Sequence, residues 1–146
     1  MIDSRGIAKL TDFGMTRFKT NQHMTSRIGT SIYMAPEIVN NEFYDEKCDV
    51  FSFGIIMFEV FTRNFKPYGA NTAQIEIKVA QNPLFRFVFF FQISNNKKRP
   101  ALPVDMGPLD HSQIAFIELM TKCWSHNASA RPSFSEIIAA LNSIQG

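Results

Sequence analysis

The sequence predicts a mainly α-helical chain with a short β element at its N-terminus. Residues 50–61 are apolar almost without a break, with Ser52 and Glu59 as the polar interruptions. A run of this length is too short to span a bilayer, so it predicts a helix that is buried nearly all round. Near the end of the chain, Ser133-x-x-Glu136 precedes apolar residues at helical spacing. This pattern is typical of a capping box and predicts the start of a second helix.

The remaining elements follow from local signals along the chain. Ile7 to Thr11 is a short strand-like run, whereas Met15 to Thr30 is polar and lacks periodicity, which indicates a long exposed loop. Proline suits the first position of a helix, so Pro36 predicts the start of a short one. We expect longer helices over residues 47–62, 72–81, 112–124 and 133–144, the first of them central.

Residues 85–98 do not fit this helical pattern. Five of the 15 phenylalanines fall between Phe85 and Phe91, and two Asn and two Lys residues follow them closely. A short apolar run cannot be typed by periodicity, so a buried strand and a buried turn of helix both stay open. Left exposed, such a segment would aggregate easily, because it combines high β-propensity with few charges.

Composition and charge favour one compact intracellular domain. The chain has 146 residues, of which 45% are hydrophobic, and this suffices for one sizeable core. The net charge is +2 with Lys and Arg scattered, so nothing points to nucleic acid or to an anionic membrane. Cys48 and Cys123 form no metal or redox motif and are interpreted as free thiols. No signal peptide is visible, so we expect a cytoplasmic protein without a membrane span.

Several short motifs occur in a fixed order along the chain. Asp12-Phe13-Gly14 alone is weak, because a given tripeptide appears by chance in roughly 2% of chains of this length. The order and spacing of the motifs that follow make coincidence improbable. They are Gly29-Thr30, Ala35-Pro36-Glu37, Asp49-Val50-Phe51-Ser52-Phe53-Gly54, Cys123-Trp124 and Ala130-Arg131-Pro132. The chain resembles the protein kinase family, and within it the tyrosine-kinase-like branch of Ser/Thr kinases, over almost its whole length except residues 87–98.

The resemblance implies a fold, a site and cofactors. The fold is the C-terminal lobe of a kinase domain, in which residues 1–10 are similar to the hairpin that follows the catalytic loop. Asp12 would be a ligand of Mg²⁺ in a complex with ATP, because a carboxylate is a natural ligand for this ion. Phe13 would pack beneath it, and Gly14 would give the backbone freedom to turn. The plain alternative for this triplet is a turn at the end of a strand.

Residues 15–37 would form the activation segment of such a kinase. Thr25 and Ser26 are its best-placed phosphorylation sites, although for any single hydroxyl an unmodified polar loop is the better interpretation. Gly29 and Thr30 would lie on the substrate side. Thr30 resembles the threonine that contacts the catalytic aspartate and lysine in Ser/Thr kinases. The partners implied are protein substrates or partner proteins.

Three further residues would hold this lobe together. The resemblance implies a buried ion pair between Glu37 and Arg131, and the planar guanidinium suits a two-point contact with a carboxylate. Asp49 lies at the head of the apolar helix, where unpaired N–H groups favour an acid. By resemblance, Asp49 also grips the backbone of the catalytic loop. Trp124 is most simply a large core side chain at a helix end.

Some parts that a kinase needs are missing from these residues. There is no G-x-G-x-x-G loop, and none of His23, His111 and His126 opens an H-R-D-x-x-x-x-N catalytic loop. Catalytic residues are therefore absent, and binding of ATP and Mg²⁺ by the chain alone is expected to be weak. We interpret residues 1–146 as a partial kinase domain that cannot phosphorylate a substrate alone.

Two alternatives stay open. In the first, the chain is a non-catalytic, pseudokinase-like module that binds other proteins. In the second, it completes an active kinase by associating with a separately encoded N-terminal lobe. Residues 87–98 fall where the family has a short loop before a proline, so we interpret them as an atypical insertion.

Overall fold

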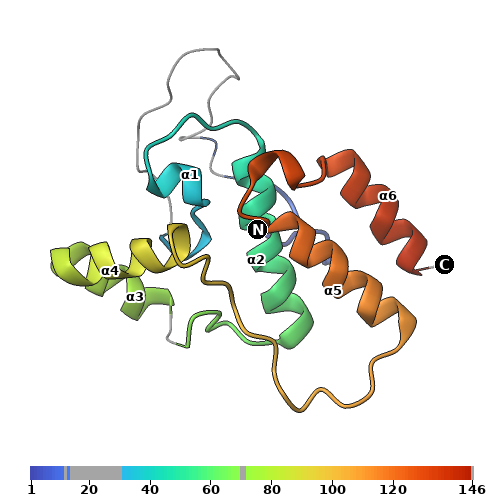
Figure 1. Ribbon diagram of the computed structural model, residues 1–146. Coiled ribbons are helices and arrows are strands. Elements are labelled where there is room, and N and C mark those ends of the chain that lie inside the picture. Colours follow the sequence, from blue (N-terminus) through green and yellow to red (C-terminus); the bar gives the residue numbers. More distant parts are fainter. Residues whose placement is uncertain (12, 14–30, 70–71, 146) are drawn as a thin grey trace.

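The computed structural model describes residues 1–11, 13, 31–69 and 72–145 (Figure 1). The predicted mainly helical fold is confirmed. The second and third helices begin and end at the predicted residues, and the last two begin within one residue of the predicted positions. In order, the described elements are η2 (Ser31–Tyr33), α1 (Pro36–Val39), α2 (Lys47–Thr62), α3 (Thr72–Gln81), α4 (Pro83–Ser94), α5 (His111–Cys123), η3 (Ala128–Ala130) and α6 (Phe134–Gln145), where η marks a 3₁₀ turn.

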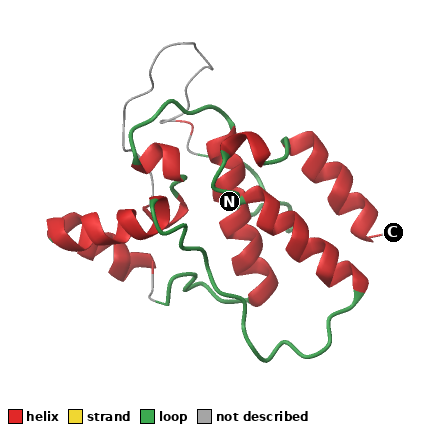
Figure 2. Ribbon diagram, viewed as in Figure 1, coloured by secondary structure: helices red, strands yellow, loops and turns green. Residues whose placement is uncertain are grey.

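The predicted β element at the N-terminus is not seen as a strand in the described residues (Figure 2). Ile2 and Ala8 form one isolated antiparallel bridge instead. Asp3 shapes the turn between them, because its Oδ1 accepts hydrogen bonds from the backbone N–H groups of Arg5 (2.9 Å) and Ile7 (3.0 Å). Two short segments without a third strand bury too little surface to extend such a bridge into a sheet.

α2 is the element around which the other helices gather (Figure 1). α5 packs along it and carries α6 on its outer side, while η2 contacts α2 and in turn supports α3. α4 packs against α3 and α1. Together these contacts arrange the elements across the molecule in the order α6, α5, α2, η2 and α3, with α4 and α1 completing the far side. None of the described helices combines the length and the apolar character that crossing a membrane requires.

Gly54 allows α2 and α5 to approach closely. A Cβ atom at this position would lie 3.1 Å from the Cβ of Cys123 and 3.1 Å from the backbone nitrogen of Trp124. Glycine inside a helix costs stability relative to alanine. The close approach compensates by bringing the rings of Phe58 and Trp124 to 6.1 Å between centroids. A side chain at position 54 would separate the two helices.

The last two helices both begin at capping boxes. Ser133 Oγ accepts from the backbone N–H of Glu136 (3.2 Å), and Glu136 Oε2 accepts from the backbone N–H of Ser133 (2.6 Å). This is the box that the sequence predicted. Asp110 and Gln113 make the equivalent pair at the start of α5, at 2.8 and 3.0 Å. That second box was missed, although Asp110-x-x-Gln113 carries the same signal.

The Phe-rich segment is helical, so of the two alternatives left open by the sequence the turn of helix is the one observed. Asn82 Oδ1 accepts from the backbone N–H of Phe85 (3.0 Å), and Pro83 occupies the first turn of α4. Phe89 is buried, and its ring meets that of Tyr68 edge-on at 5.6 Å. An N-cap followed by proline defines a helix start, and here it outweighs the β-propensity of the phenylalanines.

Replacing Gly54 by Ala should lower the free energy of unfolding by about 1–2 kcal/mol. Overpacking against α5 should exceed the gain in helix propensity, which is about 1 kcal/mol. Urea unfolding followed by circular dichroism measures the change. The control is Ala80→Gly on the exposed side of α3, which reports helix propensity without a packing change. A Gly54→Ala protein more stable than the parent would contradict the close contact of α2 and α5.

Candidate functional site

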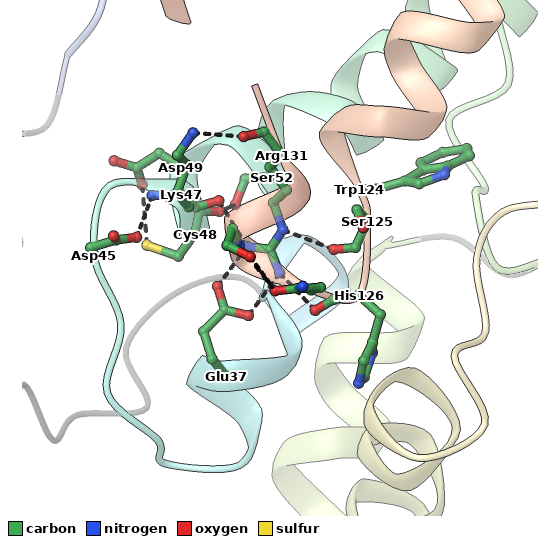
Figure 3. Close-up of polar contacts among 12 residues, drawn as sticks. Glu37, Asp45, Lys47, Cys48, Asp49, Ser52, Trp124, Ser125, His126 and Arg131 are labelled. Carbon is green, nitrogen blue, oxygen red and sulfur yellow. Dashed lines mark hydrogen bonds and ion pairs between the residues drawn. The ribbon is translucent and has the colours of Figure 1, made fainter. Parts of the chain in front are cut away.

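A buried ion pair joins α1 to the loop that follows α5. Arg131 Nη1 lies 2.6 Å from Glu37 Oε1, and Arg131 Nη2 lies 2.8 Å from Glu37 Oε2 (Figure 3). The two residues are 2% and 7% exposed. A two-point contact between a guanidinium and a carboxylate is the geometry in which both charges lose water with the least penalty. The structure thus brings together the two residues that the sequence analysis paired.

The remaining donors of Arg131 bind backbone carbonyl groups. Its Nε donates to the carbonyl oxygen of Ser125 (2.8 Å), and its Nη1 donates to that of Lys47 (2.8 Å). Lys47 Nζ donates in return to the carbonyl oxygen of Arg131 (2.6 Å). The guanidinium also lies 5.1 Å from the centroid of the Phe51 ring. One arginine therefore ties together α1, the first turn of α2 and the segment after α5.

A second polar link fastens η2 to α2. The hydroxyl of Tyr33 lies 3.1 and 3.0 Å from the two carboxylate oxygens of Glu59. Ser52 Oγ donates to the carbonyl oxygen of Tyr33 at 2.8 Å. Burial and the neighbouring carboxylate raise the pKa of Tyr33 to about 12. Burial also raises the pKa of Glu59, while the hydrogen bond from Tyr33 opposes this. Both ends of residues 31–37 are thus attached to the helical core.

One side of α2 is exposed, which the prediction of a helix buried nearly all round did not anticipate. Asp49, Phe53, Ile56 and Val60 are spaced by four, three and four residues, so they share one face of the helix. Ile56 is 44% exposed and Val60 is 67% exposed. Phe53 is half-buried, because its ring meets that of Phe134 in α6 at 5.8 Å. We call these four residues the exposed α2 face.

Asp49 stands at the head of the exposed α2 face. It lies in the first turn of the helix, where the helix dipole favours an acid. Partial burial raises the pKa of its carboxyl group, and a weak contact from Cys48 Sγ at 3.9 Å works against that rise. Burial and the Asp49 charge raise the pKa of the Cys48 thiol to about 12. Within the described part of the chain Asp49 has no ion-pair partner.

Most other predicted site residues lie outside the described residues. This holds for Asp12, Gly14 and residues 15–30, which include Thr25, Ser26, Gly29 and Thr30. Phe13 is described, and its side chain is 65% exposed. In the part of the chain that the structure covers, no three His, Cys, Asp or Glu side chains gather in a way that suits a metal ion.

Comparisons with known proteins match nearly the whole chain. The family described as "Protein kinase domain" matches residues 1–141. The chain is 36% identical over 146 residues to dual specificity protein kinase shkD of Dictyostelium discoideum, covering 99% of this chain and 17% of that protein. It is 35% identical over 148 residues to probable serine/threonine-protein kinase SIS8 of Arabidopsis thaliana, covering 99% of this chain and 12% of that protein. The chain thus spans only a small part of these relatives.

Replacing Glu37 by Gln should lower the free energy of unfolding by about 3 kcal/mol or more, because Arg131 would keep its charge in a buried place without a counter-charge. Urea unfolding measures the loss. The matched control is Arg5→Gln, which breaks the exposed pair with Asp3 at 3.4 Å and should leave stability nearly unchanged, because solvent screens that pair. Equal losses of unfolding free energy in the two variants would mean that the buried ion pair stabilises the fold no more than the exposed one does.

Replacing Tyr33 by Phe should destabilise the fold by about 1–3 kcal/mol at neutral pH, because Glu59 loses a hydrogen-bond donor while staying buried. The pKa of Glu59, already raised by burial above 4.5, should rise further. A carboxyl group with a raised pKa in the folded state stabilises folding below its unfolded pKa and loses that contribution as pH rises through the folded pKa.

The penalty of Tyr33→Phe should therefore shrink as the pH is lowered towards 4.5, the ordinary pKa of Glu59. Chemical unfolding of parent and variant at neutral and acidic pH measures the difference. Adding Glu59→Gln should remove the dependence on pH. A penalty that is the same at both pH values would show that Glu59 and Tyr33 are not coupled.

Proposed function

Since this chain belongs to the protein kinase family, we propose that residues 1–146 form the C-terminal lobe of a Ser/Thr kinase of the tyrosine-kinase-like branch. In a complete enzyme this lobe would hold the protein substrate while the γ-phosphoryl group of ATP passes to a Ser or Thr hydroxyl. Two observations support that acceptor class. SIS8 is named a serine/threonine-protein kinase, and Thr30 stands where Ser/Thr kinases have a threonine.

The observation that carries this proposal is the exposed α2 face. Ile56 and Val60 lie in water on the helix around which the others gather, and an exposed apolar patch marks an interaction site. Asp49 adds a carboxylate that can accept hydrogen bonds from a backbone. A catalytic loop packed on this face would cover the apolar side chains and supply donors for Asp49. The face therefore suits the remainder of a kinase domain.

The ion pair of Glu37 and Arg131 would act as a positioning device. It fixes the end of residues 15–37, the proposed activation segment, against the segment that follows α5 and the first turn of α2. Neither residue would touch the reacting atoms. Thr25 and Ser26 are the proposed phosphorylation sites of that segment. A phosphate there would order the segment only where arginine side chains can pair with it.

Asp12 would be the Mg²⁺ ligand of this lobe, and the bound ion would neutralise charge on the phosphate oxygens of ATP. Residues 1–146 contain neither a Gly-rich loop nor an H-R-D-x-x-x-x-N loop. Their donor set for Mg²⁺ and ATP is thus incomplete. We infer that the 146-residue polypeptide alone binds ATP weakly and transfers no phosphoryl group. The other groups would come from a longer chain or from a separate N-terminal lobe.

Two further assignments belong to this proposal. Residues 87–98 would be an insertion between α3 and the Arg99-Pro100 pair that leads towards α5, and most of these residues belong to α4. The free thiols of Cys48 and Cys123 support a reducing compartment, which is the cytoplasm. A non-catalytic protein-binding role is the second candidate, and the exposed apolar side chains of α4 are the observation that favours it.

Mixing the 146-residue chain with a separately expressed N-terminal kinase lobe that ends after its catalytic loop should restore phosphorylation of a generic protein substrate. The chain alone should give no transfer. Asp12→Ala in the mixture should lower the rate by about 100-fold or more, since cooperating catalytic groups fail together. Radiolabelled phosphate transfer measures the rate, and a thermal shift with Mg²⁺ and ATP reports binding by the chain alone.

The interface can be tested in the same mixture. Val60→Glu on the exposed α2 face should abolish complementation while leaving the chain folded, because the side chain is exposed. Val104→Glu, at another exposed position, is the matched control and should complement normally. Phosphorylation by the isolated chain that is lost in Asp12→Ala would contradict its proposed inactivity. If the Val60→Glu chain restores phosphorylation as well as the parent chain does, the exposed α2 face is not the interface with the N-terminal lobe.

A further inference from the structure

α4 exposes a continuous stripe of large apolar side chains. Leu84, Phe87, Val88 and Phe91 are spaced i, i+3, i+4 and i+7, so they lie on one face of the helix. Leu84 is 71% exposed and Phe87 is 66% exposed. The rings of Phe87 and Phe91 lie 5.9 Å apart. We call these four residues the α4 stripe.

The α4 stripe is not the face by which the helix joins the fold. Phe89 and Ile93 serve that purpose, and both are buried. Phe85 stacks on Phe89 at 6.1 Å on the same inner side. The packing of α4 is thus complete without the α4 stripe. In Figure 1, α4 extends outward beside α3, at the edge of the molecule opposite α6.

A groove runs beside the α4 stripe, between α4 and the end of α1. Its volume is about 430 Å³. Phe87 and Phe91 belong both to the α4 stripe and to the groove wall, and Val39 and Arg86 line it as well. A groove of this size is comparable to pockets that enclose one compact ligand. Here it has room for one or two large side chains of a partner.

The segment that forms the α4 side of the groove is predominantly basic. Residues 72–99 carry five basic side chains and one acidic one, a net charge of +4, while the whole chain carries +2. All other residues therefore sum to −2. The side chain of Arg86, in the groove wall, makes no hydrogen bond or ion pair with any residue that the structure describes, and Lys97 and Lys98 are exposed just beyond α4. The groove thus presents an available guanidinium beside apolar rings.

We propose that the α4 stripe and its groove dock an amphipathic helix of another protein, with large apolar anchors at helical spacing and Asp or Glu residues beside them. Apolar anchors would cover the α4 stripe and insert one side chain into the groove, as helices do in grooves generally. A carboxylate next to the anchor would pair with Arg86. This site does not depend on phosphoryl transfer or on the exposed α2 face.

Two other occupants fit the same observations less well. A second copy of the chain would bring two segments of net charge +4 together, which the like charges oppose. An anionic membrane would suit the basic charge, but a flat bilayer leaves a concave groove unfilled. A helix with apolar and acidic residues satisfies the α4 stripe, the groove and the charge at once.

The test uses the full 146-residue chain and two synthetic helical peptides labelled with a fluorophore. One peptide carries Leu at i, i+3, i+4 and i+7 with Glu at the flanking positions, and the other carries Lys in place of each Glu. Fluorescence anisotropy should show binding of the Glu peptide, with the Lys peptide at least about tenfold weaker. Added salt should weaken binding of the Glu peptide, because exposed charge pairs are screened.

Two variants locate the site. Phe87→Gln should weaken binding of the Glu peptide about tenfold or more, because an anchor contact is lost. Arg86→Glu should weaken the Glu peptide and strengthen the Lys peptide. Both side chains are exposed, so circular dichroism should show an unchanged fold. Val104→Gln and Lys122→Glu, elsewhere on the surface, are the matched controls and should bind like the parent.

Several results would overturn the proposal. One is equal binding, or absence of binding, of both peptides. Another is a dimer in analytical ultracentrifugation that Phe87→Gln dissolves, which would assign the α4 stripe to a second copy. A third is flotation with phosphatidylserine vesicles that Phe87→Gln abolishes, which would assign it to a membrane.

Discussion

The buried ion pair of Glu37 and Arg131 is the constraint that the arrangement of this molecule depends on. Neither charge can move alone without leaving the other in a place of low polarity, which costs several kcal/mol. Because Arg131 also donates to the carbonyl groups of Ser125 and Lys47, its position fixes three backbone segments together. A buried pair adds little net stability compared with apolar residues of the same volume. Its contribution here is to define which segments meet.

One side of α2 is covered by Arg131 and α5, and we call it the completed side. Another side is exposed to water, and we call it the open side. On the completed side, Phe51 lies under the guanidinium of Arg131, and Gly54 admits α5 to close contact. On the open side, the exposed α2 face leaves Ile56 and Val60 in water. Each of these partly exposed side chains forgoes a fraction of the about 1.5–3 kcal/mol that full burial contributes. A helix that is so well fixed on one side and so poorly covered on the other is suited to receive another piece of protein.

The sequence predicted what local patterns determine, and it failed where distant segments decide. α2 and α3 were predicted to the residue, because apolar runs and helix boundaries are local signals. The pairing of Glu37 with Arg131 came from a resemblance rather than from spacing. The carbonyl groups of Lys47, Ser125 and His126 that bind Arg131 were not predictable, because a backbone acceptor has no residue-type signature. The open side of α2 was missed because an apolar side chain looks the same in a sequence whether it is covered or not.

The two exposed apolar surfaces differ in charge, and this difference gives each its own selectivity. The exposed α2 face is headed by an acid, Asp49, which favours hydrogen-bond donors such as the backbone of a loop. The α4 stripe lies in a segment of net charge +4, which favours carboxylates. Apolar area alone would let either surface accept almost any partner, so the neighbouring charges must supply the discrimination. A partner whose charges complement one surface would bring like charges to the other surface. One small chain could therefore keep the two proposed docking sites distinct.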